Sequence, residues 1–230
     1  DATGKKVDCL IVKNDFKYEL HESVRTRTDE EIEKLTKQDY VQIAKDAGLV
    51  GLGGSGFPTY IKLNTKTNID IVLANGVECE PKLISDYELM LNHPDELIKG
   101  LIYSMKAVSA KTGIIAVKKK YVEVIERLNF ALNAYSDYDV RVVPVGNYYP
   151  QGWELEAIKS ATGIVVPQGK LPGDYGVIPF NVSTLQSIFH AVKYGLPVLE
   201  RYFVISGDGA VNKSFKARIG TSIQSLLDLA

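Results

Sequence analysis

Short apolar segments alternate with amphipathic segments through the middle of the chain, and this alternation limits the fold more than any other feature. Residues 69–74, 113–117 and 140–145 are rich in Ile, Val and Ala, which is typical of buried strands. The intervening segments carry apolar residues at helical spacing, as between Leu97 and Val108. Strands that alternate with helices form βαβ units. We therefore predict an α/β fold, with a Rossmann-like, mostly parallel sheet flanked by helices.

Local signals place the individual elements. Thr28-x-x-Glu31 and Ser85-x-x-Glu88 resemble capping boxes that begin helices, and Pro94 suits the first turn of the next helix. The other predicted elements are helices at 39–47, 124–132, 153–161 and 181–194, strands at 7–13 and 202–206, and a Gly- and Pro-rich loop at 162–180.

Composition narrows the function classes. The apolar runs are too short to cross a bilayer, and a net charge of −1 offers no basic field for nucleic acid. The two cysteines, Cys9 and Cys79, cannot ligate a four-cysteine iron–sulfur cluster. We expect a reduced, cytoplasmic setting, although one disulfide between them stays open. His21, His93 and His190 lack metal-like spacing, so we predict no metal site.

Four glycines within six residues form the sharpest local signal, at Gly51, Gly53, Gly54 and Gly56. Glycine allows positive φ and lets a backbone approach a ligand closely, and exposed amides in such a loop can form an anion-binding nest. The loop matches neither GxGxxG after a strand nor a P-loop. A flexible turn is the alternative interpretation.

An acidic turn follows the strand predicted at 69–74 and contains Asn75, Glu78 and Glu80. Ligands in open α/β sheets bind beyond the carboxyl ends of strands. These side chains could therefore hydrogen-bond a heterocycle or a ribose, and the alternative is a solvated turn.

Together these segments resemble the FMN-binding core shared by two flavoproteins, the C subunit of the Rnf electron-transport complex and the flavin (51 kDa) subunit of respiratory complex I. Residues 51–62 are similar to the family's GxGGAGFPTxxK loop, with Ser55 in place of Ala, and residues 75–81 to its NxxExEP turn. Residues 149–154 resemble the YPxGxE segment of the Rnf branch, and 181–184 the NVxT helix start.

Two departures indicate the Rnf-like branch, because Leu52 and Trp153 replace an Arg and a Glu of the complex I branch. The resemblance implies an FMN/NADH-binding α/β domain at 28–198, preceded by the remnant of another domain or a linker at 1–27. Residues 199–230 resemble the start of a small ubiquitin-like (SLBB) β-grasp domain, which we expect to be truncated.

The resemblance also implies the cofactors and their site. FMN and NADH would bind this chain, and the iron–sulfur clusters of relatives would lie in regions absent from it. The residues implied to bind cofactor are Gly51, Gly53, Gly54, Gly56, Phe57, Lys62, Asn75, Glu78, Glu80, Tyr149, Glu154, Asn181 and Thr184.

Within this set, Glu80 and Glu154 would position the reacting rings and serve as the catalytic residues. Asn181 and Thr184 begin a helix, whose amides and dipole suit the FMN phosphate. The alternatives are plain helix capping for these two, simple packing for Phe57 and a surface position for Lys62.

The implied activity is an NADH:acceptor oxidoreductase, in which NADH gives a hydride to FMN and electrons continue to clusters outside this chain. The parent would be a membrane-associated Rnf protein or a soluble relative such as the proline reductase-associated electron-transfer protein. Expected partners are a dinucleotide and other electron-transfer subunits or domains. The expected location is cytoplasmic, or peripheral at the inner face of the membrane through those subunits. The alternative is a scaffold without flavin, suggested by Lys82, which stands where an aromatic residue is expected.

Overall fold

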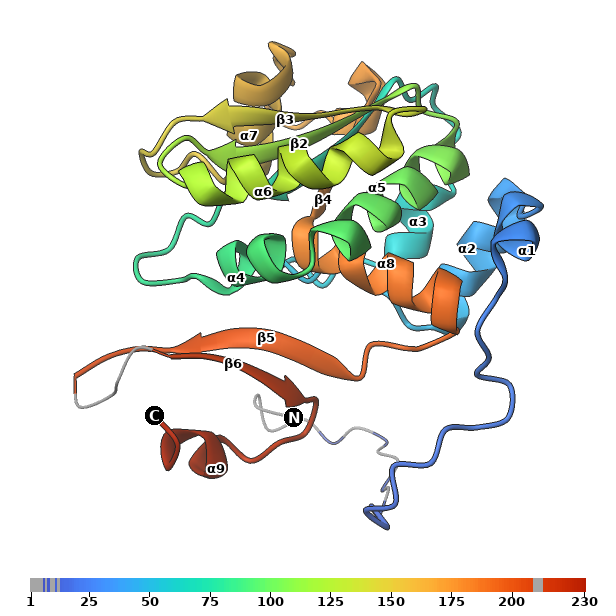
Figure 1. Cartoon of the computed structure of the whole chain (residues 1–230), viewed down its shortest axis with the longest axis vertical. Coiled ribbons are helices and arrows are strands. Elements are labelled where there is room, and N and C mark those ends of the chain that lie inside the picture. The colour runs from blue at the N-terminus through green and yellow to red at the C-terminus, as the bar shows by residue number, and fades with distance from the viewer. Residues whose placement is uncertain (1–5, 7, 9–10, 12, 209–212) are drawn as a thin grey trace.

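A computed structural model of the chain describes residues 6, 8, 11, 13–208 and 213–230 (Figure 1). The strand predicted at 7–13 falls largely outside the described residues, as does Cys9. The helices are α1 (Asp29–Glu33), α2 (Lys37–Asp46), α3 (Thr59–Leu63), α4 (Ser85–Asn92), α5 (Pro94–Val108), α6 (Val122–Leu132), α7 (Glu154–Thr162), α8 (Val182–Tyr194) and α9 (Ile223–Leu227), with 3₁₀ turns η1 (Asn133–Tyr135) and η2 (Pro172–Tyr175). The strands are β1 (Ile71–Gly76), β2 (Thr112–Lys118), β3 (Asp139–Val145), β4 (Val177–Asn181), β5 (Glu200–Ile205) and β6 (Lys213–Arg218).

Four parallel strands in the order β3-β2-β1-β4 form the main sheet, which confirms the predicted α/β fold. Side chains alternate between its faces because successive Cβ atoms in a strand point in opposite directions. Val72 and Ala74 pack into the core beneath α5 and α8, whereas Leu73 packs with Ile158 of α7 on the other face. Helices cover both faces, and this explains why the central strands β1 and β2 carry continuous apolar runs.

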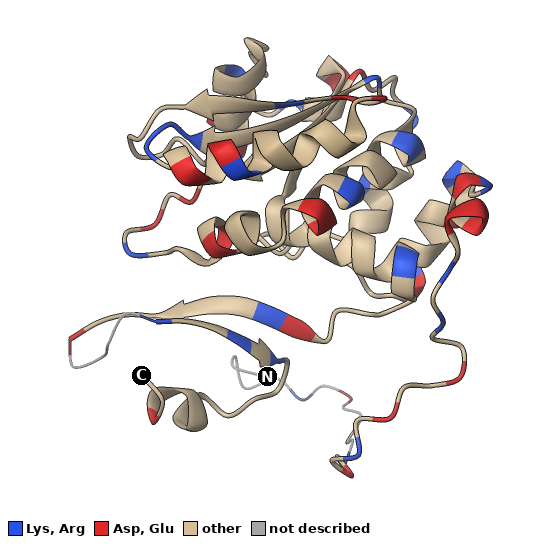
Figure 2. Cartoon of the chain, viewed as in Figure 1, with Lys and Arg blue, Asp and Glu red and all other residues tan. Residues whose placement is uncertain are grey.

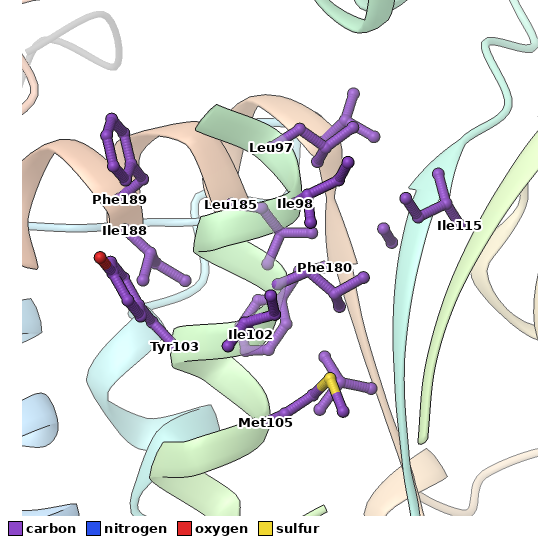
Figure 3. Close-up of a cluster of buried hydrophobic side chains, with 14 of the residues drawn as sticks. Leu97, Ile98, Ile102, Tyr103, Met105, Ile115, Phe180, Leu185, Ile188 and Phe189 are labelled. Atoms are coloured by element: carbon purple, nitrogen blue, oxygen red, sulfur yellow. The ribbon is translucent and has the colours of Figure 1, made fainter. Parts of the chain in front are cut away.

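The larger core lies where α5 and α8 pack together against the sheet (Figure 3). The predicted apolar stripe of α5 is confirmed, because all six of its residues are buried: Leu97, Ile98, Leu101, Ile102, Met105 and Val108. Gly100 permits the close approach of the two helices, since an added Cβ would lie 1.9 Å from the carbonyl oxygen of Leu185 on α8.

Strand β4 corrects the loop predicted at 162–180. It is only five residues long and contains Pro179, and both features favour a loop in sequence-based reasoning. Pro179 is tolerated because β4 lies at the edge of the sheet, where its missing N–H costs no ladder hydrogen bond.

Helix starts follow the local signals with one difference. Thr28 and Glu31 form the predicted capping box of α1, and Pro94 occupies the first turn of α5. Helix α4 begins at Ser85 as predicted, but no capping box forms there, because the Ser85 hydroxyl donates instead to Glu78.

The C-terminal strands β5 and β6 form a separate antiparallel hairpin followed by α9, below α4 and α8 in Figure 1. Strand β5 confirms the strand predicted at 202–206, and the hairpin is consistent with the start of a β-grasp domain. Acidic and basic positions are interspersed over the described elements (Figure 2). No helix in the described part of the chain combines the length and apolar character needed to span a bilayer. The domain boundaries at 28 and 199 stay predictions.

Candidate functional site

A cavity of about 890 Å³ opens beyond the carboxyl ends of β1 and β4, the edge at which open α/β sheets bind ligands. Its walls come from the glycine loop, the acidic turn after β1, the 149–154 segment, the start of α8 and strand β5. Every predicted site residue except Gly56 lines it. Folding thus brings together segments that lie more than a hundred residues apart in the sequence, and their contact with a cofactor stays a prediction.

The glycine loop folds back on itself and leaves its tip amides free. The Gly51 amide donates to the Phe57 carbonyl at 2.8 Å, and the Gly56 amide donates to the Gly51 carbonyl at 3.0 Å. Gly56 adopts φ +61° here, so its part is to close the loop rather than to line the cavity. Within the described residues, no protein group accepts a hydrogen bond from the amides of residues 53–55. Such a row of free amides fits an anion.

Gly53 brings the loop against the start of α8. An added Cβ at Gly53 would lie 3.0 Å from Cβ of Asn181 and 3.2 Å from its Cγ, closer than side chains normally pack. A side chain at position 53 would therefore press on Asn181, which would have to shift by a few tenths of an ångström. This close contact sets the width of the cradle between the loop tip and the helix N-terminus.

Of Asn181 and Thr184, only Asn181 has the capping role that sequence analysis kept as the alternative. The Asn181 side chain accepts from the Ser183 amide at 2.9 Å and so caps α8. The Thr184 hydroxyl accepts from the Leu52 amide at 2.9 Å and so holds the glycine loop. Both side chains still line the cavity, and a contact with phosphate is compatible with these roles.

The acidic turn and the 149–154 segment are joined through Asn75 and Gly152. The Asn75 side-chain amide donates to the Gly152 carbonyl at 2.9 Å, and the Gly152 amide donates to Sγ of Cys79 at 2.9 Å. An added Cβ at Gly152 would lie 1.8 Å from the Val77 carbonyl oxygen. Gly152 is therefore a site residue that sequence analysis quoted within a motif but assigned no role.

Glu78 is buried and directed toward α4. Its carboxylate accepts from the Ser85 hydroxyl at 3.0 Å and from the Asp86 amide at 2.8 Å. Burial raises the pKa of Glu78, and these hydrogen bonds oppose the rise. The carboxylate thus takes the place of a helix cap, and a direct contact between Glu78 and a cofactor stays a prediction.

Asp86 is a site residue that sequence analysis missed, because no motif signal marks it. Its buried carboxylate accepts from the Asn181 amide at 2.7 Å and from the Ser183 hydroxyl at 3.1 Å. Burial, helped by the neighbouring Glu78 charge, raises the pKa of Asp86 to about 7. Asp86 therefore orients the side chain that faces the glycine loop.

Lys62 is half-buried rather than a surface residue. Its Nζ donates to the Pro179 carbonyl at 2.8 Å and lies 3.4 Å from Oε2 of Glu154. These contacts hold a cation and a carboxylate side by side in the cavity wall. Glu80 lines the cavity at its exposed mouth.

Three aromatic side chains that line the cavity are unusually exposed: Phe57 at 42%, Tyr149 at 77% and Trp153 at 58%. Large aromatic faces exposed beside a cavity suit stacking against a planar heterocycle. The cavity therefore offers free amides, a cation and aromatic surface together.

Comparison with known proteins agrees with this chemistry. Residues 44–190 match the family described as Nuo51 FMN-binding domain. The chain is 34% identical to the C subunit of the Na(+)-translocating ferredoxin:NAD(+) oxidoreductase complex of Acetobacterium woodii, over 99% of this chain and 51% of that protein. It is 39% identical to the cobalamin reductase PduS of Citrobacter freundii, over 80% of this chain and 40% of that protein. The chain thus spans about half the length, or less, of these curated relatives.

A solved structure shares the fold. A chain of the NAD+-reducing [NiFe]-hydrogenase in its H2-reduced state matches with a TM-score of 0.71 at 22% identity, over 83% of this chain and 38% of that chain. The segment matched by the family covers more than half of the present chain and contains all the predicted site residues. The chain therefore belongs to the family of Nuo51-type FMN-binding domains, in which the flavin subunit of complex I and the Rnf complex's C subunit also fall.

Proposed function

We propose that this chain is the FMN-binding module of an NADH-dependent electron-transfer protein, an NADH:acceptor oxidoreductase. Bound FMN would supply the chemistry of a hydride acceptor and one-electron donor, joining NADH to iron–sulfur clusters outside this chain. The protein supplies binding, orientation and electrostatics. No group of three or more Cys, His, Asp or Glu side chains within the described residues is placed to hold a metal ion.

The cradle between the glycine loop and the start of α8 is the observation that carries this proposal. The free amides of residues 53–55 face a site to which Gly53 adds no side chain. The α8 N-terminus contributes the positive end of a helix dipole to the same wall. This donor set fits a phosphate group better than a neutral ligand.

The remaining walls fit the ring system of a flavin and a second heterocycle. Phe57, Tyr149 and Trp153 offer stacking faces. Lys62 keeps the Glu154 carboxylate within 3.4 Å and so limits where that carboxylate can point. We propose that Glu154 and Glu80 orient the nicotinamide and flavin rings through hydrogen bonds, without acting as an acid or a base.

The partners follow from the relatives. The names of the relatives include a component of a ferredoxin:NAD(+) oxidoreductase complex and a cobalamin reductase, so we propose that the final acceptor is a one-electron carrier reached through other subunits or domains. We place the module on the cytoplasmic side, attached at the inner face of the membrane through those partners.

Anaerobic reduction of the FMN-loaded chain tests the proposal. NADH should bleach the flavin absorbance in a stopped-flow experiment, and dithionite serves as the control that shows the flavin is reducible. Bleaching by dithionite but not by NADH would contradict the proposed hydride transfer from NADH, while FMN binding would still stand. Failure to bind FMN at all would favour the scaffold interpretation, in which the fold is kept without flavin.

A further inference from the structure

Arg201 of β5 reaches the glycine loop from the C-terminal hairpin. Its Nη2 donates to the Leu52 carbonyl at 2.7 Å, across 149 positions of sequence. The Leu52 amide donates at 2.9 Å to the Thr184 hydroxyl of α8. Both backbone polar groups of Leu52 are thus held by side chains from other elements, one on each side of the loop.

We propose that Arg201 is a positioning residue of the FMN cradle, so that the hairpin formed by β5 and β6 is a working part of the flavin site. This inference rests on the proposed function. Arg201 acts through Leu52: it holds the peptide immediately before Gly53, and Gly53 begins the row of free amides.

The loop needs such a restraint. Gly53 and Gly54 are exposed and have no side chains with which to anchor themselves, and glycine loses more conformational freedom on ordering than any other residue. A loop that is already ordered binds its ligand more tightly, because less entropy is lost on binding. The two contacts at Leu52 supply this order at the residue immediately before the loop tip.

The surroundings of Arg201 suit a charged donor. The guanidinium is partly buried, and a hydrogen bond from a charged group to a carbonyl is stronger than a neutral one. Burial lowers the pKa of Arg201, while the negative charge of Asp86 opposes that change. The charge of Arg201 thus acts near the same buried carboxylate that orients Asn181.

Comparing FMN with riboflavin shows whether Arg201 acts on the phosphate cradle, and hydrogen exchange without ligand separates ordering of the loop from direct binding of the phosphate. The variants are Arg201→Gln, Arg201→Lys, and Arg218→Gln as the matched control. Arg218 lies on the same hairpin, carries the same charge and stacks on Tyr18 outside the cavity. Titrations of the full chain with each flavin give the dissociation constants.

Arg201→Gln should weaken FMN on the order of tenfold and riboflavin by a smaller factor, because the row of amides that Arg201 orders is proposed to hold the phosphate, which riboflavin lacks. Arg201→Lys should recover part of the loss, because a lysine keeps a charged donor, and Arg218→Gln should bind like the unchanged protein. A loss of FMN affinity without faster hydrogen exchange in the ligand-free loop would overturn the proposal, because it would assign Arg201 to the phosphate itself. Unchanged binding of both flavins would overturn it as well.

Hydrogen exchange without ligand provides an independent readout. Amides in the 52–56 segment should exchange faster in Arg201→Gln and in Thr184→Val than in Arg218→Gln. Equal exchange rates in all variants would overturn the proposal that Arg201 orders the glycine loop. If the unchanged protein binds no flavin, the proposed function fails, and the exchange result still decides whether Arg201 orders the loop.

Discussion

The core around α5 and α8 and the hairpin formed by β5 and β6 are held by different forces. Three consecutive residues of β1, Val72, Leu73 and Ala74, are completely buried, whereas no residue of β5 or β6 is fully buried. Polar contacts hold much of the hairpin, such as Arg201 to the Leu52 carbonyl and the Tyr202 hydroxyl to His93 at 3.1 Å, and the Tyr202 ring adds one partly buried contact with the core.

This difference predicts that the two regions differ in local stability and contribute differently to the site. Apolar burial makes the core the most stable part of the chain, whereas a segment attached by a few polar contacts opens locally at low cost. The flavin cavity has walls from both regions. The core therefore sets the framework of the site, and the hairpin adjusts the order of its glycine loop.

Gly100→Ala should have the largest effect. In an exposed helix this change stabilises by up to about 1 kcal/mol, but here the new Cβ would lie 1.9 Å from the Leu185 carbonyl. We expect a loss of about 3 kcal/mol of unfolding free energy from overpacking, measured by urea denaturation. A neutral or stabilising result would show that α5 and α8 can move apart without loss of stability. The core would then not be more tightly packed than the hairpin, as the comparison assumes.

Asp86→Asn should change how stability depends on pH. The pKa of Asp86 is raised from 3.8 to about 7 in the folded chain. The folded state therefore holds this proton more tightly than the unfolded state, and the resulting stability is lost as the pH rises toward 7. We expect the unfolding free energy to fall by about 2 kcal/mol between pH 5 and pH 8 through this residue.

In Asp86→Asn this decline should be absent. Asp137→Asn, at an exposed position, is the matched control and should follow the curve of the unchanged protein. Parallel curves for Asp86→Asn and the unchanged protein would mean that Asp86 does not titrate in this range.

Glu154→Ala tests the wall of the site that the core supplies. Loss of a hydrogen bond to a cofactor should slow reduction of FMN by NADH about tenfold, and Glu154→Gln should slow it less. FMN affinity should change less than the rate of reduction. Glu156→Ala, on the same helix but bonded to Tyr148 outside the cavity, should reduce at the normal rate. Equal rates in both alanine variants would remove Glu154 from the hydride site.

Phe215→Ala should have the smallest effect on global stability. Phe215 stacks on Phe203 across the hairpin, with ring centroids 5.7 Å apart, and such pairs contribute about 1 kcal/mol or less. Thermal unfolding should therefore change little, while hydrogen exchange in β5 and β6 should accelerate. Leu101→Ala in the core should cost about 3 kcal/mol in comparison. A large global loss in Phe215→Ala would show that the hairpin unfolds together with the core.

Local patterns predicted the features that depend on neighbouring residues. The capping box at Thr28 and the stripe on α5 were confirmed because a helix start and a helix face are determined within a few residues. Strand β4 was missed for the same reason, since its Pro179 is acceptable only at a sheet edge.

The contacts of His93 and His190 could not be predicted from the sequence, because they depend on the fold. The spacing of the histidines suggested no common role, yet His190 lies 3.0 Å and His93 3.6 Å from opposite oxygens of Glu96. Burial alone would raise the pKa of Glu96, but hydrogen bonds from His190 and Gln186 hold it at about 2. One of these histidines also bonds Tyr202 of the hairpin.

By itself, the sequence determined the alternation of strands and helices, the glycines that the loop requires, and the family. These properties reside in residue type and short spacing, which are independent of how distant segments meet. Only the tertiary structure decided that Asp86 orients Asn181, that Gly152 lies against Val77, and that Arg201 holds Leu52. Such contacts depend on packing between segments up to 149 positions apart, because a hydrogen bond or a steric contact forms only when the fold brings its two atoms within a few ångströms.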